Sequence, residues 1–560
     1  MRKLMIYMLI FCGATTIGLG QNSNLENAEV VIEKQSSFEL PVMSRDYEKI
    51  DKIQRKNKKV PQQYNVTLIN EEVADSLPQQ LPAVLDQREE KKFYDKYIRA
   101  GFGNYITPYV ELGINGNTNP NFDYGVKFYH KSSQEGAVGR KLSAESRNEF
   151  DAFATKYSDY GITNASINYN RQGTHFYGFT ADPNMISQDS IKQIIQSIGF
   201  DVSHEIPSYL TGNDLSFKGG LLFDYTFDHY NANEVELGLQ LEGDYQLNED
   251  AKINAHLKGA YNQYNNKTLT DTEISQNRSW FKLGVNYQTF LDDIYIKAGL
   301  KLAYSGDTSQ YDKGFYIYPD ILVRYTISED ELAAFFKVDG DLELVNYNNV
   351  TSMNPWVNNN LNLLHEDKAI NIQLGAEANL SDEIGVKGSI GYALSNNMGF
   401  LINSPTDVSR FEMVYATNDK TGNFKIDLEG MWSKREWEVI AQARLNAYNV
   451  QDTLIGKAYH RPISENTISV KYKYLSNWKF GAVVYNKIGI KAVEFDPQTG
   501  ARNEINLPVI FDLNLTAQYQ FNENLSAFGL VNNLFSQKYQ EYYRYNVRGF
   551  QLMAGVSYKF

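Results

Sequence analysis

The chain ends in Phe550-Gln551-Leu552-Met553-Ala554-Gly555-Val556-Ser557-Tyr558-Lys559-Phe560, where every even-numbered residue is apolar. Among the odd-numbered residues of this stretch only Met553 is apolar. Because successive side chains of a β-strand point to opposite faces, the alternation predicts a strand with one apolar face. A regular strand with an aromatic residue at its end is typical of the closing strand of a transmembrane β-barrel. The side chains predicted to face lipid are Phe550, Leu552, Ala554, Val556, Tyr558 and Phe560.

The same alternation returns along the chain from about Tyr97 onward. It is clear in 235–245, 253–261, 281–288, 294–305, 370–380, 384–394 and 511–521. One face of each segment is apolar, and the other is too polar for the interior of a β-sandwich. An apolar outer face and a polar inner face are what a water-containing transmembrane barrel requires. Tyrosine, with 40 residues, is abundant and suits the aromatic girdles of such barrels.

Two neighbouring segments supply the candidate residues for the lumen. The polar faces of 235–245 and 252–261 carry opposite charges. Pairing between adjacent strands is the simpler explanation, and a substrate path along the wall is the alternative. The predicted lumen-facing residues are Glu236, Gln240, Glu242, Asp244, Lys252 and Lys258.

Turns and loops of two lengths separate the predicted strands. Short acidic turns lie at 248–250, 291–293, 328–330, 381–383 and 522–524. Longer polar loops lie at 132–147, 181–192, 346–367, 448–463, 490–507 and 533–546. Short turns on one rim and long loops on the other are typical of outer-membrane barrels. The sequence therefore predicts an all-β fold, a transmembrane antiparallel β-barrel of about 22 strands within a range of roughly 18 to 24.

The N-terminus predicts export. Arg2 and Lys3 precede an apolar stretch from Leu4 to Leu19, and Gly20-Gln21 offers a cleavage point, so 1–20 is a predicted signal peptide. Beyond it no run of 18 apolar residues predicts a transmembrane helix. The only cysteine, Cys12, lies in this signal. Disulfides, thiol catalysis and cysteine-ligated metals are therefore not expected in the mature chain.

Between the signal and the barrel, 21–92 is charged and proline-punctuated, with seven basic residues in 45–59. We interpret it as a solvated periplasmic extension. The alternative is a docking segment for a periplasmic or lipoprotein partner, or for anionic lipid headgroups. The barrel domain is predicted to cover 93–560.

The sequence contains no recognisable catalytic or cofactor site. The seven histidines lack the spacing of a metal site, and no phosphate-binding loop or nucleophile elbow occurs. We expect His365-Glu366-Asp367 to be a solvated cluster of polar loop residues. The net charge of −13 has the wrong sign for a nucleic-acid partner. No enzyme activity, cofactor or metal is therefore expected.

A longer C-terminal stretch resembles a known family. Val531-Asn532-Asn533-Leu534-Phe535-Ser536-Gln537-Lys538-Tyr539, followed by 549–560, resembles the end of TonB-dependent outer-membrane receptors. Ala458-Tyr459-His460-Arg461-Pro462 is similar to another of their loop-to-strand transitions. The resemblance implies a 22-stranded barrel in the cell outer membrane, with Phe560 as a signal for the barrel-insertion machinery. Those receptors also carry an N-terminal plug inside the barrel, whereas 21–92 is shorter and lacks its β pattern.

These observations predict a plugless relative that acts in transport across the outer membrane or as a barrel subunit of an envelope complex. One alternative is a non-transporting assembly subunit of a secretion or protein-insertion machine, and another is a porin-like passive channel. A lumen of this size without a plug needs another occluding element. The candidates are the 21–92 segment, inward-folded loops such as 346–367, and a partner protein.

Overall fold

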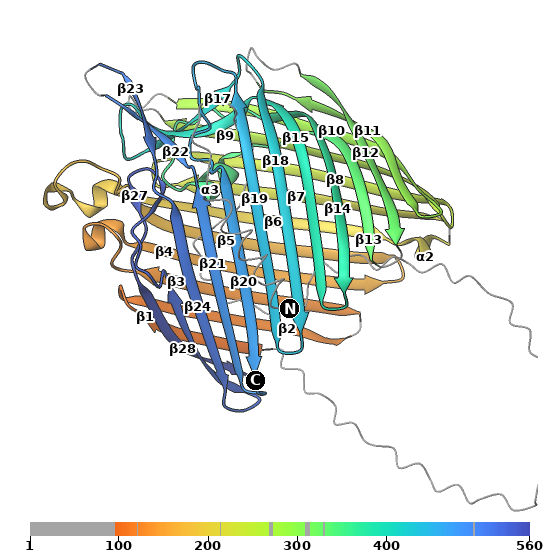
Figure 1. Ribbon diagram of the computed structural model, residues 1–560, viewed down its shortest axis with the longest axis horizontal. Coiled ribbons are helices and arrows are strands. Elements are labelled where there is room, and N and C mark those ends of the chain that lie inside the picture. The colour runs from red at the N-terminus through yellow and green to blue at the C-terminus, as the bar shows by residue number, and fades with distance from the viewer. Residues whose placement is uncertain are drawn as a thin grey trace, which may run out of the picture.

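The computed structural model describes residues 96–119, 121–212, 214–267, 273–307, 314–328, 331–496 and 499–560. The predicted signal peptide at 1–20 and the predicted extension at 21–92 lie outside these residues. The described chain folds into one large antiparallel barrel whose strands run obliquely around a common axis (Figure 1). No helix in the described part of the chain is long and apolar enough to cross a membrane.

Twenty-two strands of the described chain pair in a single closed sheet, as the sequence predicted. The first eleven are β1 (Lys96–Gly103), β2 (Thr107–Asn119), β3 (Phe122–Ser133), β4 (Glu145–Ser158), β5 (Gly161–His175), β6 (Lys192–Ile206), β7 (Leu215–Asp228), β8 (Asn233–Asn248), β9 (Ala251–Lys267), β10 (Glu273–Leu291) and β11 (Ile294–Ser305). The second eleven are β12 (Phe315–Ser328), β13 (Leu332–Glu343), β14 (Glu366–Ser381), β15 (Ile384–Asn396), β18 (Thr421–Lys434), β19 (Trp437–Val450), β20 (Ser464–Tyr474), β21 (Trp478–Ile488), β24 (Ile510–Gln520), β25 (Leu525–Asn532) and β28 (Gln551–Lys559).

The barrel closes between its first and last strands. Strand β1 pairs with β28 in an antiparallel register that joins Tyr97 to Lys559 and Gly103 to Met553. Its other edge pairs with β2, so every barrel strand has a neighbour on both sides. Closure removes the unpaired sheet edges, which lipid cannot satisfy by hydrogen bonding. The alternating stretch at the C-terminus therefore completes the ring.

The two rims differ as the sequence predicted. All the predicted long loops lie on one rim, whereas the described parts of the predicted short turns lie on the other, beside the start of β1 and the end of β28. The turn between β10 and β11 is typical of the short rim. Its first residue, Asp292, has a φ of 49°, the left-handed conformation that two-residue hairpins need and that Asp tolerates.

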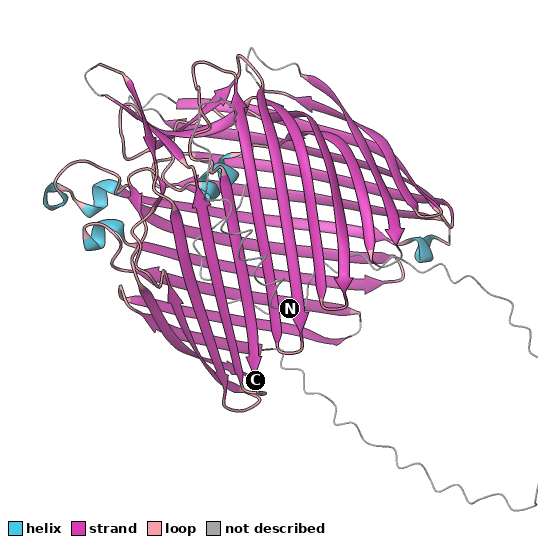
Figure 2. Cartoon of the chain, in the orientation of Figure 1, coloured by secondary structure: helices cyan, strands magenta, loops and turns pink. Residues whose placement is uncertain are grey.

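The long-loop rim carries the remaining secondary structure, apart from the four-residue helix α2 (Ser208–Thr211) on the short rim. Figure 2 shows the short helices in cyan. The hairpins are β16 (Met398–Asn403) with β17 (Phe411–Ala416), β22 (Lys491–Phe495) with β23 (Arg502–Asn506), and β26 (Gln540–Tyr542) with β27 (Tyr545–Asn546). The helices are η1 (Arg140–Ser143), η2 (Pro183–Met185), η3 (Gln188–Ile191) and α3 (Tyr347–Met353).

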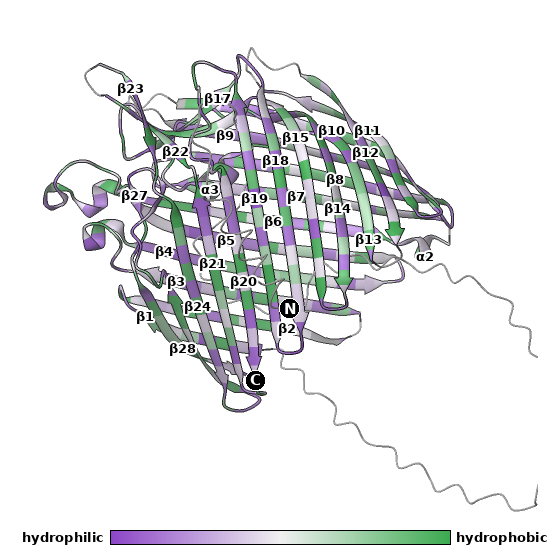
Figure 3. Cartoon of the chain, in the orientation of Figure 1, coloured by the Kyte–Doolittle hydropathy of each residue, from purple (hydrophilic) through white to green (hydrophobic). Residues whose placement is uncertain are grey.

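Apolar and polar residues alternate along the strands, as Figure 3 shows by colour. In β8 the apolar side chains Leu237 and Leu239 are exposed on the outside of the sheet. The intervening polar residues lie on the other face, where Glu236 accepts hydrogen bonds from Asn262 and Asn346. The barrel is therefore apolar outside, and polar side chains line its inner wall.

Candidate functional site: the loop cap and its cavity

Five long loops fold over one end of the barrel and together form a structure that we call the cap. It consists of 344–365, 397–420, 451–463, the described parts of 489–509, and 533–550. The hydrogen bonds of the first loop reveal its path. Trp356 Nε1 donates to Thr174 Oγ1 of β5 at 3.2 Å, and Met353 O accepts from Tyr542 OH at 2.8 Å. A loop can contact such distant parts of the ring only by lying across its opening.

The cap has a hydrophobic core of its own. The stacked rings of Trp356 and Tyr545 have centroids 4.0 Å apart, and Phe411 packs edge-on to Tyr542. Several members are fully buried although they belong to loops on the barrel rim. Burial of this extent gives the cap a fixed structure, since packed aromatic side chains dominate such cores. The buried members of the cluster are Ala232, Tyr264, Tyr347, Val350, Val357, Leu361, Leu363, Leu401, Phe411 and Tyr545.

One barrel strand, β8, holds the start of helix α3. Glu234 of β8 accepts the backbone N–H of Tyr347 at 2.6 Å, and Glu236 accepts the side-chain amide of Asn346 at 2.7 Å. Asn346 also caps the helix by accepting the backbone N–H of Asn349. Acidic groups at a helix N-terminus satisfy its free N–H groups and complement its dipole. The inner wall therefore fixes the position of the loop that crosses the barrel.

A buried arginine joins the two ends of the same loop. Arg278 of β10 donates to Asp307 at 2.8 Å, to the carbonyl oxygen of Val345 at 2.6 Å and to His365 Nδ1 at 2.7 Å. The Arg278 and Asp307 side chains are each 2% exposed. Burial, together with the adjacent guanidinium, holds the pKa of His365 well below its usual range. His365 is thus a neutral acceptor in a buried ionic network.

This network corrects the expectation for His365-Glu366-Asp367. We expected a solvated loop cluster, but the three residues are 1%, 5% and 3% exposed. Asp367 accepts hydrogen bonds from Tyr318 OH at 2.7 Å and from Asn396. The expectation was wrong because the sequence does not show that the preceding loop folds inward and covers these residues.

His460 connects three of the cap loops. Its Nδ1 donates to the carbonyl oxygen of Leu401 at 2.8 Å, and its Nε2 accepts the backbone N–H of Tyr543 at 3.2 Å. One ring nitrogen donates and the other accepts, which is the pattern of a neutral imidazole. Burial lowers the pKa of His460 to about 4. The imidazole therefore joins the loops without adding charge at neutral pH.

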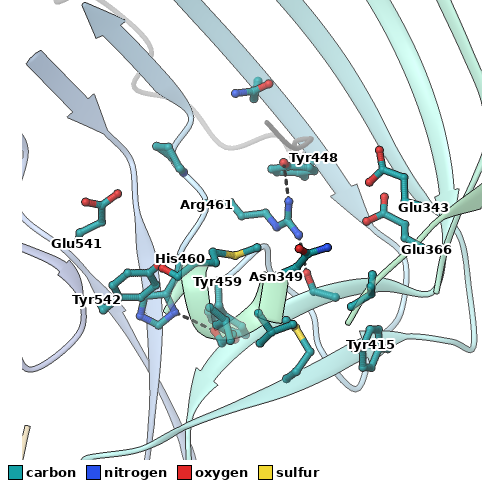
Figure 4. A pocket seen from close by; sticks show the side chains of 18 of the residues that line it. Glu343, Asn349, Glu366, Tyr415, Tyr448, Tyr459, His460, Arg461, Glu541 and Tyr542 are labelled. Carbon is teal, nitrogen blue, oxygen red and sulfur yellow. Dashed lines mark hydrogen bonds between the residues drawn. The ribbon is translucent and has the colours of Figure 1, made fainter. Parts of the chain in front are cut away.

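Beneath the cap lies a cavity of about 490 Å³ (Figure 4). Four carboxylates line it, but only two cationic side chains do. Its walls also contain four tyrosines and the thioethers of Met353 and Met413. The volume and the mixture of apolar walls with a few polar groups are typical of small-molecule sites. The charged lining residues are Glu343, Glu366, Glu465, Glu541, Arg461 and Lys487.

Both cations of the cavity already have partners. Lys487 of β21 forms ion pairs with Glu465, at 3.3 Å, and with Glu541. Arg461 donates to the carbonyl oxygen of Gly399 and to Tyr448 OH, and its guanidinium lies 5.0 Å from the ring centroid of Phe400. Figure 4 shows Arg461 and Tyr448 together on one side of the cavity. Outside the cavity lining, Lys368 forms an ion pair with Glu343.

The predicted lumen-facing residues lie on the polar face of β8 and β9, below the cap. Asp244 forms an ion pair with Lys252 at 3.3 Å, and Glu242 accepts from Asn254 at 3.2 Å. Cross-strand pairing therefore accounts for part of this face. The structure places Gln240 opposite Lys258, which is exposed. A substrate path along these residues stays a prediction.

The predicted outward face of the last strand is exposed along its whole length. Phe550, Leu552, Val556, Tyr558 and Phe560 are between 38% and 54% exposed. Ala554 is exposed as well, whereas Met553 and Ser557 on the other face are buried. A continuous apolar strip on the outside of a closed barrel is what contact with lipid requires.

No catalytic cluster is evident in the described chain. His175 lies at the long-loop end of β5, whereas His204 of β6 pairs in register with Thr163 near the opposite rim. Within the described residues no group of three His, Cys, Asp or Glu side chains could hold a metal ion.

Sequence reasoning missed the residues that organise the cap. His460 and Arg461 belong to the motif noted for its resemblance to a loop-to-strand transition, but nothing in the sequence gives them or Arg278 a role in the cap. The partners of each come from distant segments. One local signal was present. The four tyrosines in 539–545 are too many for a solvated loop, and they indicate a packed aromatic core.

Comparisons with known proteins bear on the fold. Neither a protein-family model nor a curated protein matches the chain. Solved structures do match, several of them with sequence identities of only 10–13%. The FrpB iron transporter from Neisseria meningitidis is 12% identical, with a TM-score of 0.65 and coverage of 84% of this chain and 82% of that chain.

Two further solved structures give similar results. The siderophore receptor PirA from Acinetobacter baumannii is 10% identical, with a TM-score of 0.64 over 83% of this chain and 80% of its own. The ferric-catecholate import receptor Fiu from E. coli K12 is also 10% identical, with a TM-score of 0.63 over 83% and 82%. The predicted resemblance to TonB-dependent outer-membrane receptors is therefore confirmed at the level of the barrel fold.

Proposed function

We propose that this chain is an integral outer-membrane barrel that takes part in transport across that membrane, with the cap as its gate. The observation that carries the proposal is the path of loop 344–365 across the barrel opening, fixed by Glu234 and Arg278. A passive pore has no need of a packed core above its lumen. The barrel fold shared with an iron transporter and an import receptor supports the same reading.

The outer surface supports a membrane location. Like β28, strand β8 has exposed apolar side chains on its outer face, among them Leu237 and Leu239. Polar groups satisfied inside a closed ring and apolar side chains outside it suit lipid and not water. We further propose that the predicted signal at 1–20 directs export, and that 21–92 extends into the periplasm. Heat-modifiable migration in detergent gels and fractionation with outer membranes test the location.

Conductance in planar bilayers tests the gate. The wild-type barrel should show little steady conductance, because the cap covers its opening. Replacing 347–361 by a short Gly-Ser linker should produce a large, steady conductance. A matched control replaces 182–187 on the same rim, where Pro183–Met185 forms an exposed helix, and should behave like the wild type.

Two results would contradict the proposal. A large open conductance of the wild-type protein would favour the passive porin. A cap-shortened variant that stays closed would mean that something other than the cap occludes the lumen. The non-transporting assembly subunit, our second candidate, predicts a stable partner that co-purifies from native membranes and is lost when 25–90 is deleted.

A further inference from the structure

We propose that the cavity beneath the cap binds an organic cation, with an ammonium or guanidinium group at Glu465 and Asn446 and an apolar part against the tyrosines. The proposal gives a ligand class to the transport function proposed above and rests on that function for its biological meaning. The binding site itself is argued from the cavity alone.

Two buried acceptors lie in the wall of the cavity. Glu465 Oε2 and Asn446 Oδ1 have no hydrogen-bond partner, and the two residues are 7% and 5% exposed. Glu465 belongs to β20 and Asn446 to the adjacent β19, and both line the cavity. Buried acceptors without donors are unfavourable, so a ligand that brings N–H groups satisfies them. Two acceptors on neighbouring strands suit a group with several N–H donors.

Negative and positive side chains are unequal in number in the cavity wall. Lys487 lies between Glu465 and Glu541, so one positive charge faces two negative ones. Arg461 donates to Gly399 O and to Tyr448 OH. The lining has four carboxylates and two cations, Arg461 and Lys487. When Lys368, which pairs with Glu343 from outside the lining, is added, the carboxylates still outnumber these three cations by one. A low-dielectric cavity with an excess negative charge favours a cation and disfavours an anion.

The remaining wall contains aromatic and apolar side chains. Tyr448, Tyr459 and Tyr542 line the cavity, as Figure 4 shows, and Met353 and Met413 complete the apolar surface. Aromatic rings attract cations through their faces and also pack against apolar groups. Methionine side chains adapt to irregular ligands. The cavity therefore matches a molecule with one cationic head and an apolar or aromatic body.

Isothermal titration of the full-length protein in detergent tests this inference with two matched probes. Benzoyl-arginine amide carries a guanidinium group and a ring, and benzoyl-citrulline amide is its neutral isostere. The wild type should bind the arginine probe at least tenfold more tightly. Glu465→Gln should weaken that binding about tenfold or more, and Asn446→Asp should strengthen it several-fold. Glu438→Gln is the control, because Glu438 pairs with Lys471 near the opposite rim of the same wall.

Equal affinity for both probes would overturn the proposal, as would equal losses in Glu465→Gln and Glu438→Gln. Spermidine serves as a second, slender cation, and failure of both cations to bind would also overturn it. Heat-modifiable migration of each variant checks that the barrel has folded. The gate is scored separately by conductance, so a gated barrel without cation binding would refute only the ligand class. Cation binding by an openly conducting wild type would refute only the gate.

Discussion

Arg278 is the residue whose replacement should release the cap most completely. Its side chain is 2% exposed, and it donates to two cap residues, Val345 and His365, and to the buried Asp307. Arg278→Leu keeps an apolar side chain of moderate size but leaves the Asp307 carboxylate buried without its counter-ion. Removing one partner of a buried ion pair typically costs about 3–5 kcal/mol. We expect this cost to fall mainly on the docked state of loop 344–365.

The expected size of the effect follows from that free energy. Since about 1.4 kcal/mol corresponds to a factor of ten, the open form of the loop should become roughly 100- to 4,000-fold more populated. Hydrogen exchange of the backbone amides of Val350 and Asn354 reports this opening, because both donate within helix α3 and its C-terminal turn. Their protection should fall by the same factor, while the amides of the barrel strands keep theirs.

The matched control is Arg324→Leu. Arg324 also lies on the inner wall and pairs with Glu377, but their side chains are 26% and 22% exposed. An ion pair that water reaches contributes about 0–1 kcal/mol. Protection of α3 should therefore change little in this variant. The reasoning is refuted if Arg278→Leu alters the protection of α3 less than threefold, or if Arg324→Leu lowers it equally.

Two further outcomes are expected. The pKa of His460 is lowered to about 4, so cap stability should be complete above pH 6.5 and fall by up to about 3 kcal/mol as the pH drops toward 4. Hydrogen exchange of the cap between pH 4 and 7 measures this, and an unchanged slope in His460→Gln would contradict the assignment. Val556→Arg, on the exposed face of β28, should destabilise the barrel in lipid by about 2–4 kcal/mol. Urea unfolding in vesicles measures the loss, and no difference from wild type would argue against a lipid-facing strip.

Individual strands show how much of the fold can be predicted from the sequence. The range 294–305 was predicted from alternation alone and coincides with β11, and 384–394 lies within β15. These predictions succeed because one face of a strand in a membrane barrel contacts lipid and the other faces the polar lumen. Apolar and polar side chains therefore alternate along the strand. Loop 346–367 is among the possible occluding elements, but no residue pattern distinguishes it from the other candidates.

The sequence by itself determined the barrel, its two unlike rims and its closing strand, because the period-2 pattern is local and repeats along the chain. The tertiary structure alone decided what covers the opening. Arg278, Asp307 and His365 lie on different segments, and so do Leu401, His460 and Tyr543. Their contacts depend on the circumference of the ring, which brings loops distant in sequence over one opening. A pattern read along one strand contains no information about what lies across the lumen.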